Sequence, residues 1–221
     1  MAPEDILQGL YDRTLVGDGP GVLELTRAGL AQDLAPEKLL FEALIPSLEE
    51  VGARFERGDF FVPEMLVAGK AMAGALDVLR PLLAQTGAET AGTFVMGTVK
   101  GDVHDIGKNL VNIMLEGAGF QVIDLGVQVP PEAFVEAIAE HRPDIVGFSA
   151  FLTTTMPMFK ANVNALEKAG LRDQVLVMVG GAPVTQEYAD AVGADGYAAD
   201  ASTTVKQAKA LVTRRRALLP A

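Results

Sequence analysis

The chain of 221 residues contains no cysteine, no tryptophan and only two histidines, His104 and His141. Without cysteine, the protein has no disulfides, no thiolate zinc site, no protein-ligated iron–sulfur cluster and no thiol nucleophile. Metal binding and acid–base chemistry must therefore use histidine or carboxylate side chains.

Positive charge is also scarce, because 18 basic residues face 29 acidic ones and the formal net charge is −11. Basic residues cluster only at Arg214–Arg216, which falls short of the phosphate-neutralising surface of a nucleic-acid binder. No run of about 18 uncharged apolar residues is present, and the N-terminal segment has early acids and no long apolar run. We therefore expect a soluble, cytoplasmic protein with neither nucleic acid nor a membrane as partner.

Apolar residues, in contrast, make up 49% of the chain, which is enough for one large domain or two small ones. In residues 1–87 the apolar positions recur at spacings of three and four, a pattern that predicts four amphipathic helices. Pro46 is expected to kink or divide the third helix, because proline lacks a backbone N–H, and the fourth helix should begin around Pro63. We predict a four-helix bundle domain over residues 1–87.

Residues 86–92 are small and polar, as in a linker, and the pattern changes after them. Short β-rich runs alternate with helix-length amphipathic segments. Strands are expected at 93–99, 120–125, 144–149, 175–179 and 196–198, and helices near 106–118, 131–140, 155–169, 184–192 and 203–213. Five such repeats predict a flavodoxin-like (Rossmann-type) five-stranded parallel sheet with helices on both faces, so the fold class is α + α/β. We assign this α/β domain to residues 88–221 and expect ligands at the carboxyl ends of its strands.

The loop after the first expected strand, VKGDVHDIGKN, contains the better placed of the two histidines. Asp102 lies two residues before His104, so in an extended loop both side chains point the same way and the carboxylate accepts the second imidazole N–H, as around metal-bound histidines. Zinc normally needs three or four protein ligands, and His141 is better explained as an exposed residue near a helix end. A metal held by His104 alone must bring its other ligands with it, as a tetrapyrrole-type cofactor does. A general base and a plain surface histidine stay open as alternatives.

The segment TVKGDVHDIGKNLV resembles the cobalamin-binding signature DxHxxG, which here runs from Asp102 to Gly107. The family continues with SxL and a Gly-Gly pair at matching distances: 41 residues separate Gly107 from Ser149, and 28 separate the SxL position from Gly180. The third SxL residue is Phe151, and a leucine follows one position later. With FERGDFFVPEML in its first half, nearly the whole chain is similar to the cap and cobalamin modules of methionine synthase and to free-standing corrinoid proteins of methyltransferase systems.

The resemblance implies how the protein would hold cobalamin. His104 would be the metal ligand, replacing the cofactor's own base on the lower face of cobalt, and would form a proton relay with Asp102 and Thr155. Phe55, Val62 and Met65 of the helical cap would shield the upper face. The implied contacts to the corrin and to its displaced nucleotide tail are Gly101, Asp102, Val103, His104, Asp105, Ile106, Gly107, Ser149, Leu152, Thr153, Gly180, Gly181 and Ala201.

Several of these residues also fit plainer explanations that need no ligand. Gly180 and Gly181 suit an ordinary turn after a strand. Serine and threonine are common at helix N-caps, which applies to Ser202 and to the run Thr153–Thr155. An aromatic and two aliphatic side chains at helical spacing are also typical of the core of a helical bundle.

In function, the resemblance implies a corrinoid methyl carrier that alternates between methylcobalamin and cob(I)alamin. Its partners would be a donor methyltransferase, an acceptor methyltransferase and a reductive reactivation protein. Because 221 residues show no substrate-binding domain, we expect a carrier subunit rather than a complete enzyme. The alternatives are an adenosylcobalamin-binding sensor or light-responsive regulatory protein, the cobalamin subunit of a carbon-skeleton mutase, and a flavodoxin-like domain without cobalt.

Overall fold

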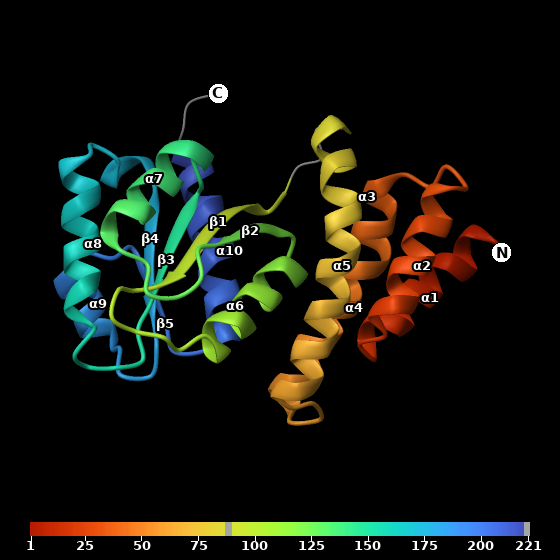
Figure 1. The fold of residues 1–221 in the computed structure, drawn as a ribbon, viewed down its shortest axis with the longest axis horizontal. Coiled ribbons are helices and arrows are strands. Elements are labelled where there is room, and N and C mark those ends of the chain that lie inside the picture. The colour runs from red at the N-terminus through yellow and green to blue at the C-terminus, as the bar shows by residue number, and fades with distance from the viewer. Residues whose placement is uncertain (87–89, 219–221) are drawn as a thin grey trace. The chain divides into compact units, whose positions relative to one another are not determined.

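The computed structural model describes residues 1–86 and 90–218. The chain divides into two compact units, Met1–Thr90 with Glu116–Gly119, and Ala91–Leu115 with Phe120–Ala221 (Figure 1). The predicted domain boundary between residues 87 and 88, and the middle of the predicted linker 86–92, lie outside the described residues. They stay predictions.

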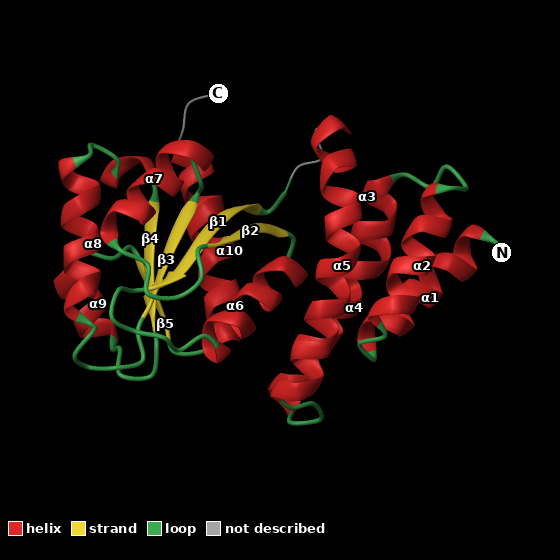
Figure 2. Cartoon of the chain, in the orientation of Figure 1, coloured by secondary structure: helices red, strands yellow, loops and turns green. Residues whose placement is uncertain are grey.

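The N-terminal unit is helical, as Figure 2 shows. Its helices are α1 (Pro3–Leu15), α2 (Gly19–Leu30), α3 (Pro36–Leu39), α4 (Ile45–Arg57) and α5 (Val62–Thr86), with the π-helical segment η1 (Leu40–Leu44) between α3 and α4. Apolar residues that recur every three or four positions lie on one side of each long helix, and that side is buried. Together they form a core that includes Ile6, Leu10, Val22, Leu39, Leu44, Leu48, Met65, Met72 and Leu79.

Local sequence explains where these helices begin and break. Asp18 caps α2 by accepting a hydrogen bond from the Gly21 N–H at 3.1 Å. The third helix is divided as predicted: the π-helical turn Leu40–Leu44 ends just before Pro46, the second residue of α4. Proline offers no N–H to the carbonyl four residues earlier, so the regular hydrogen-bond ladder is interrupted here.

The second unit is a five-stranded parallel sheet covered by five helices (Figure 2). Its strand order is β2-β1-β3-β4-β5, as in flavodoxin-like folds. The strands are β1 (Gly92–Thr98), β2 (Phe120–Asp124), β3 (Ile145–Ser149), β4 (Leu176–Gly180) and β5 (Gly196–Ala198), and the helices are α6 (Ile106–Gly117), α7 (Pro131–His141), α8 (Pro157–Lys168), α9 (Gln186–Val192) and α10 (Ala201–Leu218).

The burial of the strands explains their composition. The inner strands β1, β3 and β4 are covered on both faces and read as nearly continuous apolar runs. Phe148 of β3 packs edge-on against Phe134 of α7 and stacks on Phe159 of α8 with the ring planes 28° apart, in the core between the sheet and the helices α7, α8 and α9. The predicted four-helix bundle followed by a flavodoxin-like parallel sheet is confirmed.

The strand order places the β1–α6 loop beside the β3–α8 segment. From β1, the chain continues to β2 on one side of the sheet, while β3 pairs with β1 on the other side. Thr98, the last residue of β1, is in register with Ser149, the last residue of β3. Loops that leave the sheet at such a reversal frame a crevice where α/β proteins bind ligands, and here one of them contains His104.

Candidate functional site

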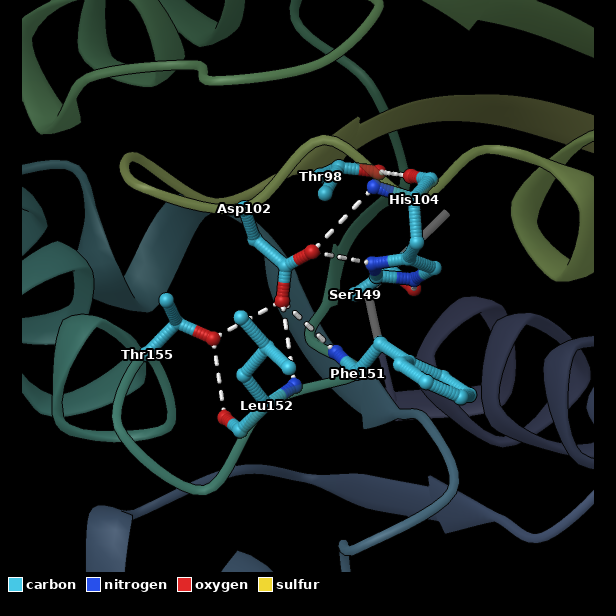
Figure 3. Close-up of polar contacts among 7 residues, drawn as sticks. All are labelled: Thr98, Asp102, His104, Ser149, Phe151, Leu152 and Thr155. Atoms are coloured by element: carbon cyan, nitrogen blue, oxygen red, sulfur yellow. Dashed lines mark hydrogen bonds and ion pairs between the residues drawn. The ribbon is translucent and has the colours of Figure 1, made fainter.

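The main chain of His104 makes two hydrogen bonds within its loop and to the end of β1. The hydroxyl of Thr98, a fully buried residue, donates to the His104 carbonyl at 2.8 Å, and the His104 N–H donates to Asp102 Oδ1 at 3.2 Å (Figure 3). Gly101 turns the loop with φ +87°, a left-handed conformation that favours glycine. The imidazole is therefore fixed to the carboxyl end of β1 by its own main chain.

Asp102 links His104 to the neighbouring segment. Its Oδ1 lies 2.7 Å from Nδ1 of His104, as the i, i+2 spacing predicts. Its Oδ2 accepts hydrogen bonds from the Phe151 N–H at 2.8 Å, the Leu152 N–H at 3.2 Å and the Thr155 hydroxyl at 2.8 Å (Figure 3). Only 2% of Asp102 is exposed. The structure therefore brings the three residues of the predicted relay into one hydrogen-bonded chain.

The electrostatics of this chain determine which ring nitrogen of His104 carries the proton. Burial raises the pKa of the Asp102 carboxyl, but hydrogen bonds from the His104 ring, the Phe151 N–H and the Thr155 hydroxyl lower it by more. The net pKa lies far below the usual range, so Asp102 is a carboxylate at neutral pH. A carboxylate only accepts hydrogen bonds, so Nδ1 of neutral His104 is protonated and Nε2 carries the lone pair.

The other ring nitrogen faces β3. Nε2 of His104 lies 2.8 Å from the hydroxyl of Ser149, and the Phe151 ring lies 5.6 Å from the imidazole, tilted by 38°. Ser149 was expected to contact a nucleotide tail, so its bond to His104 is a feature that the sequence motif did not indicate. Phe151, which occupies the leucine position of SxL, was also missed, although that departure from the motif was visible in the sequence.

Exposed apolar side chains lie in the loops at this end of the sheet. Val103 comes from the β1–α6 connection, Ile106 from the start of α6, Val127 from the β2–α7 loop, and Phe151 and Leu152 from the β3–α8 segment. They come from segments that follow β1, β2 and β3, at the carboxyl edge where parallel sheets bind ligands. Val127 was not predicted, because no motif covers the β2–α7 loop.

The other predicted contacts of the β1–α6 loop differ in their surroundings. The backbone carbonyl of Asp105 accepts a hydrogen bond from the Asn109 N–H at 2.7 Å, in the first turn of α6. A side chain on Gly107 would meet no atom within 4 Å, so the α6 surface is open there.

The ends of β4 and β5 contain the predicted glycines and Ala201. Gly181 has φ +133°, and a Cβ there would collide with the Ala150 carbonyl, so the close approach of the chain's own backbone already requires glycine. Ala201 begins α10, whose N-cap is Asp200 and not Ser202: Asp200 Oδ1 accepts from the Thr203 N–H at 2.6 Å. The N-cap interpretation of Ser202 is therefore wrong, because the helix begins earlier than expected.

The three consecutive threonines have different environments. Thr153 and Thr154 are exposed, whereas Thr155 is buried. None of them caps α8, which begins at Pro157 without a side-chain cap. The single hydroxyl proton of Thr155 has two acceptors, Asp102 Oδ2 and the Leu152 carbonyl, each at 2.8 Å. The N-cap interpretation thus gives way to a contact with Asp102.

The predicted cap residues lie on both sides of one turn of the helical unit. Phe55 is near the end of α4, and Val62 and Met65 are in the first turn of α5. Gly58, with φ +79°, ends α4 in the left-handed conformation typical of helix ends. Phe55 and Val62 are half-buried, and Met65 is fully buried.

An ion pair between a buried lysine and an exposed aspartate beside the site was not anticipated. Lys108, whose side chain is 1% exposed, donates to Asp124 Oδ2 at 2.5 Å and to Asn109 Oδ1 at 2.9 Å. Asp124 Oδ1 in turn accepts from the Gly126 N–H at 2.9 Å. The pair ties the first turn of α6 to the end of β2 and so supports the loop that precedes α6. The lysine lies in the quoted signature segment, but its partner is 16 positions away.

Two features are absent from the part of the chain that the structure describes. Within residues 1–86 and 90–218, no three histidine, aspartate or glutamate side chains converge to hold a metal ion. In the same ranges, no helix has the length and apolarity needed to span a membrane.

The chain also matches known protein families, over both of its units. Residues 92–206, more than half of the chain, match a B12 binding domain family, and residues 6–80 match a second family that is also described as a B12 binding domain. The chain belongs to the B12-binding corrinoid proteins. The dimethylamine corrinoid protein of Methanosarcina barkeri is 41% identical over 213 residues, which cover 96% of this chain and 100% of the relative. Trimethylamine corrinoid protein 1 of Methanosarcina acetivorans is 40% identical over 95% of this chain and 98% of its own.

Solved structures of corrinoid proteins have the same fold. A chain of the methanol:cobalamin methyltransferase complex MtaBC from Methanosarcina barkeri superimposes with a TM-score of 0.83 at 28% identity, covering 95% of this corrinoid protein and 80% of that chain. A cobalamin-binding protein from Desulfitobacterium hafniense gives 0.67 at 32% identity, covering 93% and 98%. The predicted family, the binding of cobalamin and the role as a methyl carrier in a methyltransferase system are confirmed.

Proposed function

We propose that this corrinoid protein carries a methyl group on cobalt, with His104 as the single protein ligand on the lower face. The observation that supports the proposal is the hydrogen-bonded chain from Nε2 of His104 through Nδ1 and Asp102 to Thr155. Asp102 holds the proton on Nδ1, so that Nε2 presents a lone pair, as a metal-binding imidazole must. When bound, the corrinoid cobalt supplies the nucleophile and the methyl carrier, as cob(I)alamin and methylcobalamin.

The residues around His104 fit such a cofactor. A corrin provides four equatorial ligands to its own metal, so one imidazole suffices from the protein. The exposed apolar side chains of Val103, Ile106, Val127, Phe151 and Leu152 suit the apolar face of a macrocycle. We assign the tail contacts to the ends of the neighbouring strands, at Ser149, Thr153, Gly180, Gly181 and Ala201.

Asp102 and Thr155 serve as proton-handling residues in this proposal. When Nε2 gains or loses a partner, the basicity of the imidazole changes, and the buried carboxylate stabilises a proton at Nδ1. The Thr155 hydroxyl has both the carboxylate and the Leu152 carbonyl as acceptors at equal distance. Its proton can therefore turn between them as the charge on the His104–Asp102 pair changes.

We assign Phe55, Val62 and Met65 of the helical unit to shielding the upper cobalt face, since excluding water protects a strong nucleophile from side reactions. The partners would be a donor and an acceptor methyltransferase and a reductive reactivation protein. A methylated amine is the donor class that we propose, because relatives named for dimethylamine and trimethylamine match over nearly their whole length. A cytoplasmic location without nucleic acid as partner stays a prediction.

Axial ligation of reconstituted protein tests the proposal. Methylcobalamin is added to wild type, to His104→Ala and to the matched control His141→Ala, and the absorption spectra are compared. Wild type and His141→Ala should both show the cofactor's own base displaced by a histidine, and His104→Ala should not. Identical ligation in all three proteins would show that His104 is not the ligand.

A further inference from the structure

The hydroxyl of Ser149 occupies the lone pair of His104 that a metal would use. The two atoms, Oγ and Nε2, are 2.8 Å apart. Because Asp102 holds the proton on Nδ1, the bond to neutral His104 has the serine hydroxyl as donor and Nε2 as acceptor. Ser149 is itself 8% exposed, so its hydroxyl depends on protein or ligand partners.

We propose that Ser149 masks Nε2, so that a corrinoid binds His104 only by displacing this hydroxyl. The proposal rests on the proposed function, since it takes His104 as the cobalt ligand. A lone pair serves one partner at a time, and the hydrogen bond and the metal bond exclude each other on Nε2.

The surrounding structure keeps both partners in place. Ser149 ends β3, where its carbonyl accepts from the Val99 N–H at 3.0 Å, and the following Phe151 and Leu152 N–H groups are fixed on Asp102. The ring of His104 is held at Nδ1 by the same carboxylate. Displacement therefore leaves the Ser149 hydroxyl buried near its present position, without the acceptor that it has now.

This arrangement makes Ser149 a specificity-determining residue. A buried hydroxyl left without a partner disfavours the complex. A corrinoid whose nucleotide tail brings an acceptor to the end of β3 restores the lost hydrogen bond, whereas a corrinoid without a tail does not. Ser149 thus lowers the affinity for tail-less corrinoids by more than the affinity for complete ones.

Binding of two corrinoids tests the selectivity. Affinities for cobalamin and for cobinamide, which lacks the tail, are measured for wild type, Ser149→Ala and Ser149→Thr. Removing the mask should raise the affinity of Ser149→Ala for cobinamide about 2- to 10-fold, the equivalent of one hydrogen bond, and leave cobalamin binding unchanged or weaker. Ser149→Thr, which keeps a hydroxyl, should behave as wild type. Cobinamide binding that is unchanged or weaker in folded Ser149→Ala would overturn the proposal. A misfolded variant would be recognised because it would bind both cobalamin and cobinamide more weakly.

A second measurement needs no corrinoid. The chain has two histidines, so a His141→Gln background leaves His104 as the only imidazole for diethylpyrocarbonate. Carbethoxylation of Nε2 should be faster in Ser149→Ala than in the parent and unchanged in Ser149→Thr. An equal or slower rate in Ser149→Ala would refute masking. Faster modification, combined with a His104→Ala spectrum like that of wild type, would instead support masking and refute the proposed ligand.

Discussion

The two histidines of this chain occupy opposite kinds of environment. His104 follows a buried strand, its side chain is 18% exposed, and both ring nitrogens have partners at 2.7 and 2.8 Å. His141 is the last residue of α7, its side chain is 37% exposed, and the Glu140 carboxylate is 4.0 Å away. Both have an acidic neighbour in sequence. What separates them is that Asp102 is buried and shared with a second segment, whereas Glu140 is exposed.

Replacing the acidic neighbours of the two histidines should therefore give the largest difference in stability. Asp102→Ala removes the acceptor of the His104 ring and of the backbone N–H groups of Phe151 and Leu152, and these donors lose their present partner. We expect a loss of about 3 kcal/mol in the free energy of unfolding. Glu140→Ala should change it by less than about 0.5 kcal/mol, because the side chain is exposed. Urea unfolding of the ligand-free proteins measures both, and equal small losses would contradict the comparison.

A fall in pH should reduce the stability that the surroundings of His104 contribute, because Asp102 becomes protonated. The pKa of Asp102 is lower in the folded protein than its unfolded value of about 4, so the carboxylate stabilises the fold above that pH. As the pH falls below about 4 towards the folded pKa, this contribution of up to about 2 kcal/mol is lost. Between pH 5 and pH 3, wild type should therefore lose more stability in urea titrations than Asp102→Asn, because the variant has no carboxyl group to protonate at this position. Parallel loss in the two proteins would show that Asp102 is not the group.

A smaller effect should separate two threonines of the same run. Thr155→Val removes a buried hydroxyl bonded to a carboxylate and should lower the free energy of unfolding by about 1 to 2 kcal/mol. Thr153→Val changes an exposed side chain and should be nearly neutral. Thermal unfolding compares the two. If Thr153→Val lowers the free energy of unfolding by more than Thr155→Val does, the Thr155 hydroxyl is not the one that stabilises the Asp102 carboxylate.

Local patterns predicted most of the fold. The expected strands and helices of the second unit agree with the structure within about two residues at most ends, because each element has a clear apolar period and each loop has its own turn residues. The start of α10 was placed late, at residue 203, since the cap at Asp200 was not recognised. Pro46 was recognised as a break because its effect on a helix is local.

The candidate site was predicted in part. The spacing of Asp102 and His104 predicted their contact, since only Val103 separates them and their side chains point the same way in an extended loop. The partner of Nε2 was not predictable in this way: Ser149 is 45 positions from His104 and meets it only through the register of β1 with β3. Phe151 was visible as a departure from the motif, but its place beside the imidazole depends on the conformation of the β3–α8 segment.

By itself, the sequence determined the chemical inventory and the order of the elements: no thiol, one histidine in a loop after a buried strand, and five alternating strands and helices. Those properties follow from composition and from short-range periodicity. Only the tertiary structure decided which groups share a proton or a lone pair. Hydrogen bonds such as those of Asp102 to Thr155, Ser149 to His104 and Lys108 to Asp124 act over about 3 Å, so they depend on strand register and side-chain orientation, which no local pattern records.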